Sequence, residues 1–167
     1  MTGKEVLVIL DDSPSSSRAV RYAGRIMEKS RGFRTCLVHL LPSLPPELLE
    51  HGGAQNPDKE GEVEAELKSE QEKWLGSAKK AAQQSLERAE GILRDAGQPK
   101  KSIQLLIGEA GDGKEAAERV FELAEKCKCH TIVVGRELAS RLHSCFSTEL
   151  PEELLLHAKG FAVWVVQ

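Results

Sequence analysis

The chain has 167 residues, of which 40% are hydrophobic and 29% charged, and its formal net charge is −3. This size and composition are typical of one globular domain, here expected over residues 1–167, without the excess of Lys and Arg that nucleic-acid binding favours. No apolar run approaches the roughly 20 residues that cross a bilayer. The first residues also lack the pattern of a secretory signal, so we expect a cytoplasmic domain with neither membrane nor nucleic-acid partners.

Two apolar runs open the chain. Residues 5–10 (EVLVIL) and 35–41 (TCLVHLL) are almost continuously apolar, which is the pattern of strands buried on both faces of a parallel sheet. Between them, Ser13 and Pro14 predict the N-cap and the first position of a helix that ends at about residue 30.

A long amphipathic stretch follows the second strand. Residues 43–61 are rich in Pro, Gly, Asn and Asp and predict a surface loop. An apolar stripe at helical spacing then predicts a helix over 62–96, which Gly97 and Pro99 end. The charged residues of this helix are expected to form a solvated face.

The second half of the chain repeats the alternation, with strands expected over 102–107, 131–134 and 161–166 and helices over 114–126 and 150–158. Such alternation predicts a three-layer α/β/α sandwich around a parallel sheet, and for its five strands we expect the order 3-2-1-4-5. Ligands of open parallel sheets bind outside the carboxyl ends of the strands, where successive connections run to opposite faces. That rule points to the segments 11–13 and 135–148.

Several segments together resemble the universal stress protein family. VLVILDDSPSSSRAVRYA looks like its first strand, Asp-x-Ser turn and first helix, and CLVHLL looks like its second strand. TIVVG and HAKGFAVWVV resemble its fourth strand and its closing helix and strand. The resemblance implies an adenine nucleotide alpha hydrolase-like fold and a stress-response or signalling role. Because the sequence offers no convincing general base, nucleophile or metal cluster, we expect a domain that is not an enzyme.

ATP-binding members of this family carry a glycine loop after the fourth strand: Gly, two residues, Gly, nine residues, Gly, then Ser or Thr. The resemblance places Gly135 at the first position, but Leu138, Thr148 and Glu149 at the other three. Glycines let backbone N–H groups approach phosphates, whereas a leucine is bulky and a carboxylate repels them. A register one residue earlier ends in Ser147-Thr148, which restores a hydroxyl but no glycine. Both registers predict weak or no ATP binding.

The nucleoside half of the family's site is matched better. By resemblance, Asp11 corresponds to the acidic residue that contacts the nucleoside, and Leu40 to the position whose backbone meets the adenine. Ser13 could help to bind an anion, although helix capping also explains it, and a role in the turn explains Asp11 equally well. The alternative function is therefore an adenine-nucleotide-binding regulatory domain, for AMP or ATP, with an altered phosphate loop.

Acidic and thiol residues leave two other interpretations open. Asp11 and Asp12 could be the acidic pair of a Mg²⁺-binding receiver domain, but neither the Asp expected after its third strand nor the Lys after its fifth is present. Without a secretory signal, the four cysteines are expected as reduced thiols. The run Cys127-Lys128-Cys129-His130 holds soft metal ligands, but its spacing is narrower than in zinc sites, and we expect a turn between helix and strand.

The last strand predicts contact between two copies of the chain. In the order 3-2-1-4-5 it lies at an edge of the sheet and is apolar on both faces, and exposed apolar edges usually need a partner. Antiparallel pairing with the same strand of a second copy would close a two-fold homodimer, as the family resemblance also implies. Shielding of the edge by side chains is the alternative. The residues expected in this interface are Phe161, Val163, Trp164 and Val165.

Overall fold

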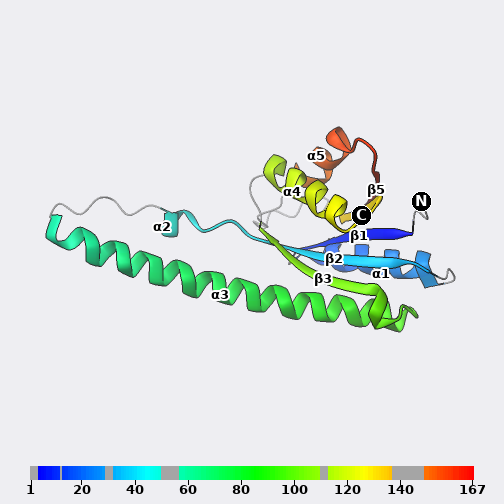
Figure 1. Ribbon diagram of the computed structural model, residues 1–167, viewed down its shortest axis with the longest axis horizontal. Coiled ribbons are helices and arrows are strands. Elements are labelled where there is room, and N and C mark those ends of the chain that lie inside the picture. The colour runs from blue at the N-terminus through cyan, green and yellow to red at the C-terminus, as the bar shows by residue number, and fades with distance from the viewer. Residues whose placement is uncertain (1–3, 12, 29–31, 50–56, 110–112, 137–148) are drawn as a thin grey trace.

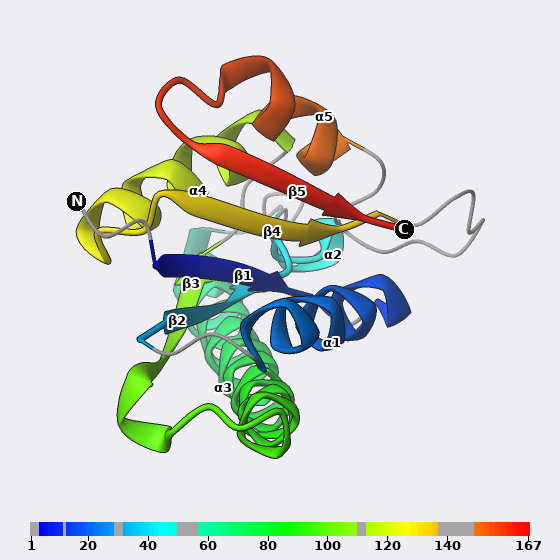
Figure 2. The ribbon, with the colours of Figure 1, turned by 90° about the vertical axis from the view of Figure 1, so that its right-hand side faces the viewer.

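The structure is a computed structural model that describes residues 4–11, 13–28, 32–49, 57–109, 113–136 and 149–167, without the side chains of 57–60, 113 and 149. Its five parallel strands form one sheet of order β3-β2-β1-β4-β5, with helices on both faces (Figures 1 and 2), so the predicted sandwich and strand order are confirmed. None of the described helices combines the length and apolarity that a membrane span requires. The elements are β1 (Glu5–Leu10), α1 (Pro14–Glu28), β2 (Arg34–Leu41), α2 (Pro46–Leu49), α3 (Pro57–Asp95), a 3₁₀ turn (Lys100–Ser102), β3 (Ile103–Glu109), α4 (Gly113–Lys126), β4 (Thr131–Gly135), α5 (Glu149–His157) and β5 (Ala162–Val166).

The central strand β1 divides the interior into two apolar cores. Leu7 and Ile9 pack with residues of α4 and α5, whereas Val6 and Val8 pack with residues of α1 and α3. Figure 2 shows these two helix pairs on opposite faces of the sheet. All four side chains are almost fully buried, as expected for a strand whose two faces are both covered.

Helix α3 is longer than predicted. The sequence predicted a loop over 43–61, but α2 forms at Pro46–Leu49 and α3 already begins at Pro57. Both helices open on a proline, which suits the first helical position because its missing N–H needs no partner there. Figure 1 shows the first half of α3 projecting away from the sheet. No residue over 61–80 is buried, whereas the apolar side chains from Ala82 to Leu93 pack onto the domain.

The turn after α4 has the geometry of a Schellman motif. The N–H of Lys128 donates to the carbonyl of Glu125 at 3.0 Å, and that of Cys129 to the carbonyl of Ala124 at 2.8 Å. The predicted turn between helix and strand is thus confirmed. Lys128 has a φ of 57°, a conformation in which a side chain crowds the backbone. Gly97, which was predicted to end α3, fills the equivalent position with a φ of 92°.

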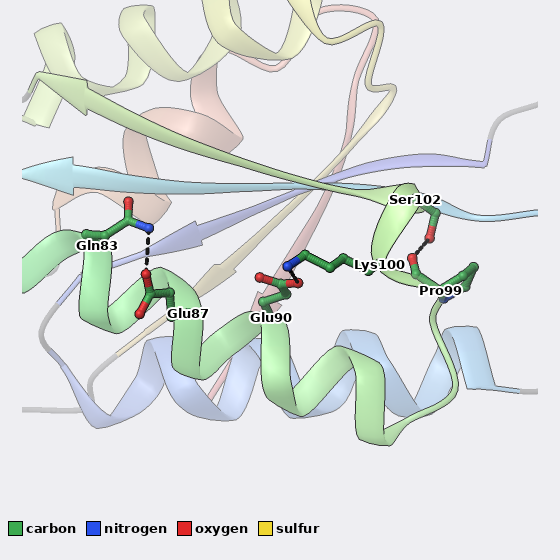
Figure 3. A network of polar contacts seen from close by, with 6 residues as sticks. All are labelled: Gln83, Glu87, Glu90, Pro99, Lys100 and Ser102. Carbon is green, nitrogen blue, oxygen red and sulfur yellow. Dashed lines mark hydrogen bonds and ion pairs between the residues drawn. The ribbon is translucent and has the colours of Figure 1, made fainter.

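A short polar turn leads from α3 into β3. Figure 3 shows Lys100 reaching back to Glu90 of α3, with its Nζ 3.8 Å from the Oε1 of Glu90. In the same view, the Ser102 hydroxyl donates to the Pro99 carbonyl at 2.7 Å. These contacts close the 3₁₀ turn that starts the next strand.

Strand β3 extends further than predicted, to Glu109 instead of Ile107. Residues 108 and 109 lie beyond the predicted end of the strand but pair with Leu40 and Leu41, because β2 also continues to that point. A Cβ on Gly108 would lie 3.0 Å from Cδ2 of Leu40, so a larger residue here would require the Leu40 side chain to move by a few tenths of an ångström.

Candidate functional site

A shallow pocket lies at the carboxyl edge of the sheet, between the ends of β1, β2 and β4 and the start of α5. It encloses about 300 Å³ when its open mouth is included, but only about 10 Å³ of this is open to the centre of a water molecule, so it is a narrow hollow and not a preformed ligand cavity. This is the edge at which the strand order predicts ligand binding. Most of the residues that line it are apolar, although slightly more of its surface is polar than apolar, and the one ionisable side chain among the described lining residues is that of Asp11. The lining residues are Ile9, Leu10, Asp11, Ser16, Leu40, Val134, Gly135, Leu150 and Pro151.

The carboxylate of Asp11 is bound into the start of α1. Its Oδ1 accepts hydrogen bonds from the backbone N–H of Ser13, at 2.8 Å, and from the Ser13 hydroxyl. The Ser13 Oγ in turn accepts from the N–H of Ser16 at 3.3 Å, which is the predicted N-cap bond. The Ser16 hydroxyl donates to the backbone carbonyls of Asp11 and Ser13, both at 2.9 Å. Asp11 therefore shapes the turn and also lines the pocket.

Gly135 ends β4 directly against the first turn of α1. A Cβ on Gly135 would lie 2.8 Å from the Oγ of Ser15 and closer still to the Ser15 carbonyl carbon and oxygen. The family resemblance gave Gly135 a role in phosphate approach, but the packing of α1 against β4 already requires a glycine at this position.

Leu40 lies on the far side of the pocket from Gly135, and its side chain is fully buried. The pairing of β1 with β2 stops at Leu10 and His39, so β2 runs on beyond β1 by Leu40 and Leu41. The backbone of Leu40 therefore borders the opening that forms where β1 ends. This is the arrangement that a backbone contact to a flat ligand would need.

The rest of the predicted phosphate loop falls largely outside the described residues. Leu138 and Thr148 both lie in the undescribed range 137–148, and of Glu149 only the backbone is described, as the first residue of α5. Asp12, on which the receiver interpretation depends, also lies outside the described residues. In the part of the chain that the structure covers, no three His, Cys, Asp or Glu side chains gather as metal ligands do.

Helix α5 closes the pocket in a way that the sequence did not reveal. Leu150 and Pro151, at its first turn, are both buried and line the pocket. The sequence predicted the helix but not its approach to the sheet, since that depends on packing against α4. The Nη2 of Arg136 donates to Oε1 of Glu152 at 2.7 Å, and its backbone N–H to the Val166 carbonyl at 2.7 Å. Arg136 thus links the ends of β4 and β5 to α5.

Comparisons with known proteins identify one family. The model of the universal stress protein family matches residues 3–167. A family member from Burkholderia pseudomallei is 17% identical with a TM-score of 0.65, over 99% of this chain and 98% of that one. A universal stress protein solved with cAMP is 18% identical, with a TM-score of 0.61 over 98% and 97% of the two chains.

A further similar structure is that of a universal stress protein from Archaeoglobus fulgidus in complex with dAMP. It is 19% identical and has a TM-score of 0.54, with 100% of both chains covered. Curated protein sequences give no significant match. The structural likenesses confirm the adenine nucleotide alpha hydrolase-like fold that was predicted from the sequence.

Proposed function

This chain belongs to the universal stress protein family, and on that premise we propose that it is a non-catalytic stress-response or signalling domain. In this proposal the domain works as a homodimer and binds ATP weakly or not at all. The observation that carries it is the composition of the pocket at the carboxyl edge, whose described wall holds no cationic side chain. Triphosphates carry several negative charges, and sites that hold them normally supply cations or converging N–H groups.

The described half of the pocket supports weak phosphate binding for a second reason. The hydroxyl of Ser13 already occupies the N–H of Ser16 at the start of α1, so a phosphate there would compete with an existing cap. Asp11 adds a carboxylate to the same wall. In the sequence, Leu138 and Glu149 stand at loop positions where ATP-binding relatives have Gly and Ser or Thr.

The absence of catalysis is part of the same proposal. Asp11 is the ionisable group of the described pocket wall, and its Oδ1 is engaged by Ser13. A general base needs a proton acceptor that is aimed at the substrate. We expect no ATP hydrolysis above background in a phosphate-release assay, and a rate that falls on changing Asp11 to Asn would overturn this part of the proposal.

A second candidate function is a regulatory domain that binds an adenine mononucleotide. Two structures similar to this chain were solved with cAMP and with dAMP, and both ligands carry a single phosphate. In this chain, the apolar residues in the lining, the Asp11 carboxylate and the backbone of Leu40 suit the nucleoside part of such a ligand. AMP would then bind better than ATP.

Calorimetry and thermal shift with ATP, ADP and AMP, each with and without Mg²⁺, separate the two candidates. We expect no micromolar ATP binding, and micromolar affinity would overturn the leading proposal. Binding of AMP at ten times its Kd would stabilise the fold by about 1.4 kcal/mol, a rise in Tm of about 4 °C. Such a rise would favour the second candidate.

Two sets of variants test whether nucleotide binding depends on Asp11 and on the phosphate loop. Asp11→Asn removes the charge but keeps an oxygen that accepts from Ser13, so we expect it to weaken AMP binding with little change in Tm. Asp11→Ala removes the oxygen too and is expected to cost about 1 kcal/mol of stability. The triple variant Leu138→Gly, Thr148→Gly, Glu149→Ser is expected to gain ATP binding if the proposed loop register is right.

The proposed homodimer forms through β5. This strand pairs with β4 on one side, and the side chains from Phe161 to Val166 are at least partly exposed. The rings of Trp164 and Tyr22 meet edge to face at 6.3 Å, which continues the apolar surface from β5 onto α1. We expect a dimer by light scattering at micromolar concentration, and a monomer would remove this part of the proposal.

A matched pair of lysine variants tests which edge is used. Ala162 of β5 and Gln104 of β3 are both exposed, at opposite edges of the sheet. Ala162→Lys is expected to shift the dimer toward monomer, because lysine on an edge strand blocks pairing, whereas Gln104→Lys leaves it unchanged. The reverse result would move the interface to β3. The cytoplasmic location expected from the sequence stays a prediction.

A further inference from the structure

A second hollow lies at the opposite edge of the sheet, among the amino ends of the strands and the end of α4. It encloses about 350 Å³ with its open mouth included. Three cysteine thiols lie at its wall, from two elements far apart in the sequence: Cys36 of β2, and Cys127 and Cys129 of the turn after α4. None of these thiols has a role in the function proposed above.

Two of the three sulfur atoms are in direct contact. The Sγ of Cys36 lies 3.0 Å from the Sγ of Cys127, although 91 positions separate them in the chain. Cys129 differs, because its Sγ contacts the backbone carbonyl of Cys127 at 3.9 Å and is directed to no second sulfur among the described residues. A disulfide has an S–S distance of about 2.05 Å, so Cys36 and Cys127 need to approach by only about 1 Å.

We propose that Cys36 and Cys127 form a redox-active dithiol, which hydrogen peroxide converts into an intramolecular disulfide between β2 and the end of α4. All three described cysteines are free thiols in the structure, so the proposal concerns a second, oxidised state of the chain. The hollow gives a small oxidant a route to Cys127, which lines it and is partly exposed, whereas Cys36 also lines it but is buried.

The reaction balances in two steps. The thiolate of Cys127 attacks one oxygen of the peroxide, the O–O bond breaks, and the released hydroxide takes a proton to leave as water. Cys127 is then a sulfenic acid. The sulfur of Cys36 next attacks the sulfur of Cys127, the S–O bond breaks, and the Cys36 proton leaves with the hydroxyl as a second water. The two thiols lose two electrons in total, and the peroxide gains them.

Burial assigns the order of these steps. Cys36 and Cys129 are each only 3% exposed, whereas Cys127 is partly exposed and meets the solvent first. Burial also raises the pKa of the Cys36 thiol well above its usual range, with the hydrogen bond to Cys127 adding to the effect. Cys36 is therefore a poor first nucleophile, and it is its contact with the sulfur of Cys127 that suits it to the second, resolving step, which the raised pKa slows. The reaction should be slow compared with that of dedicated peroxidases.

Peptide mapping of the oxidised full-length chain tests the proposal. After treatment with peroxide, we expect two of the four thiols to be lost and one cross-linked peptide pair that joins Cys36 to Cys127. The cross-link closes a long loop and should raise the Tm by roughly 10 °C, an effect that dithiothreitol reverses. A Tm that falls on oxidation, or sulfinic and sulfonic acids on Cys127 without a cross-link, would overturn the proposal.

Four single variants test the assignment, and two of them are controls. Cys127→Ser is expected to abolish the cross-link and the rise in Tm, whereas Cys129→Ser, two positions further on, and Cys145→Ser should keep both. Cys36→Ala is the second test, with alanine chosen because Cys36 is buried in the core. This variant should leave a sulfenic acid on Cys127 that a dimedone probe labels. A cross-link that survives in Cys127→Ser, or one that joins Cys129 or Cys145, would also overturn the assignment.

Discussion

A single methyl group at Gly135 tests how the pocket edge is built. Gly135→Ala would place a Cβ 2.8 Å from the Oγ of Ser15 and closer still to the Ser15 carbonyl. The obstructing atoms include backbone, so relief requires a shift of the first turn of α1. Overpacking of this kind costs about 1–3 kcal/mol, and we expect the upper end. For a chain of this size, that corresponds to a fall in Tm of about 6–12 °C.

Gly91 provides a matched control for this change. It lies within α3, and a Cβ added there meets nothing within 4 Å. Gly91→Ala should therefore stabilise the chain by about 0.5–1 kcal/mol, because glycine is a poor helix former. The two glycine-to-alanine changes are expected to have opposite signs in one urea-unfolding series.

The outcome for Gly135→Ala also shows whether packing or ligand binding requires a glycine at position 135. If Gly135→Ala changed the stability by less than about 0.5 kcal/mol, the close approach to Ser15 would not constrain this position. A variant that kept its Tm but lost nucleotide binding would give Gly135 the role of a phosphate-loop glycine instead.

Two further predictions concern the turn after α4. Lys128→Gly should stabilise the chain by about 0.5–1 kcal/mol in thermal unfolding, because Lys128 holds a φ of 57° that glycine adopts more easily; a loss of stability would contradict this. Burial raises the pKa of the Cys129 thiol from 9.0 to about 12. The unfolded chain then loses this proton first, so the free energy of unfolding should be maintained below about pH 9 and fall as the pH rises toward 12. Urea unfolding at several pH values should show a shallower fall for Cys129→Ala, and an equal slope would exclude the thiol as a cause.

The strands and the parallel sheet were predictable because their signals are local. Each strand is a short apolar run, and the alternation with helices leaves few possible topologies. The Ser13 cap and the Gly97 stop are likewise encoded within a few residues, and both are confirmed. The extent of β3 was not predictable, because Gly108 and Glu109 become strand residues only through pairing with β2.

The site was predictable only in part, for the same reason. Asp11 follows β1, and Leu40 and Gly135 lie at the ends of β2 and β4, so topology alone places these three residues at one edge of the sheet. Leu150 and Pro151 line the pocket through the docking of α5, which no short pattern encodes. The contact between Cys36 and Cys127 likewise results from the packing of α4 against β2, across 91 positions of sequence.

The two halves of α3 should differ in how their backbone amides exchange with heavy water. No residue over 61–80 is buried, so these amides depend on the helix itself and should exchange through local fraying. From Ala82 onward the helix packs into the core, where exchange requires opening of the domain. One continuous helix of 39 residues would thus contain a boundary between fast and slow exchange near Ala82, and a partner that binds its projecting half would reveal itself by slowing the first group alone.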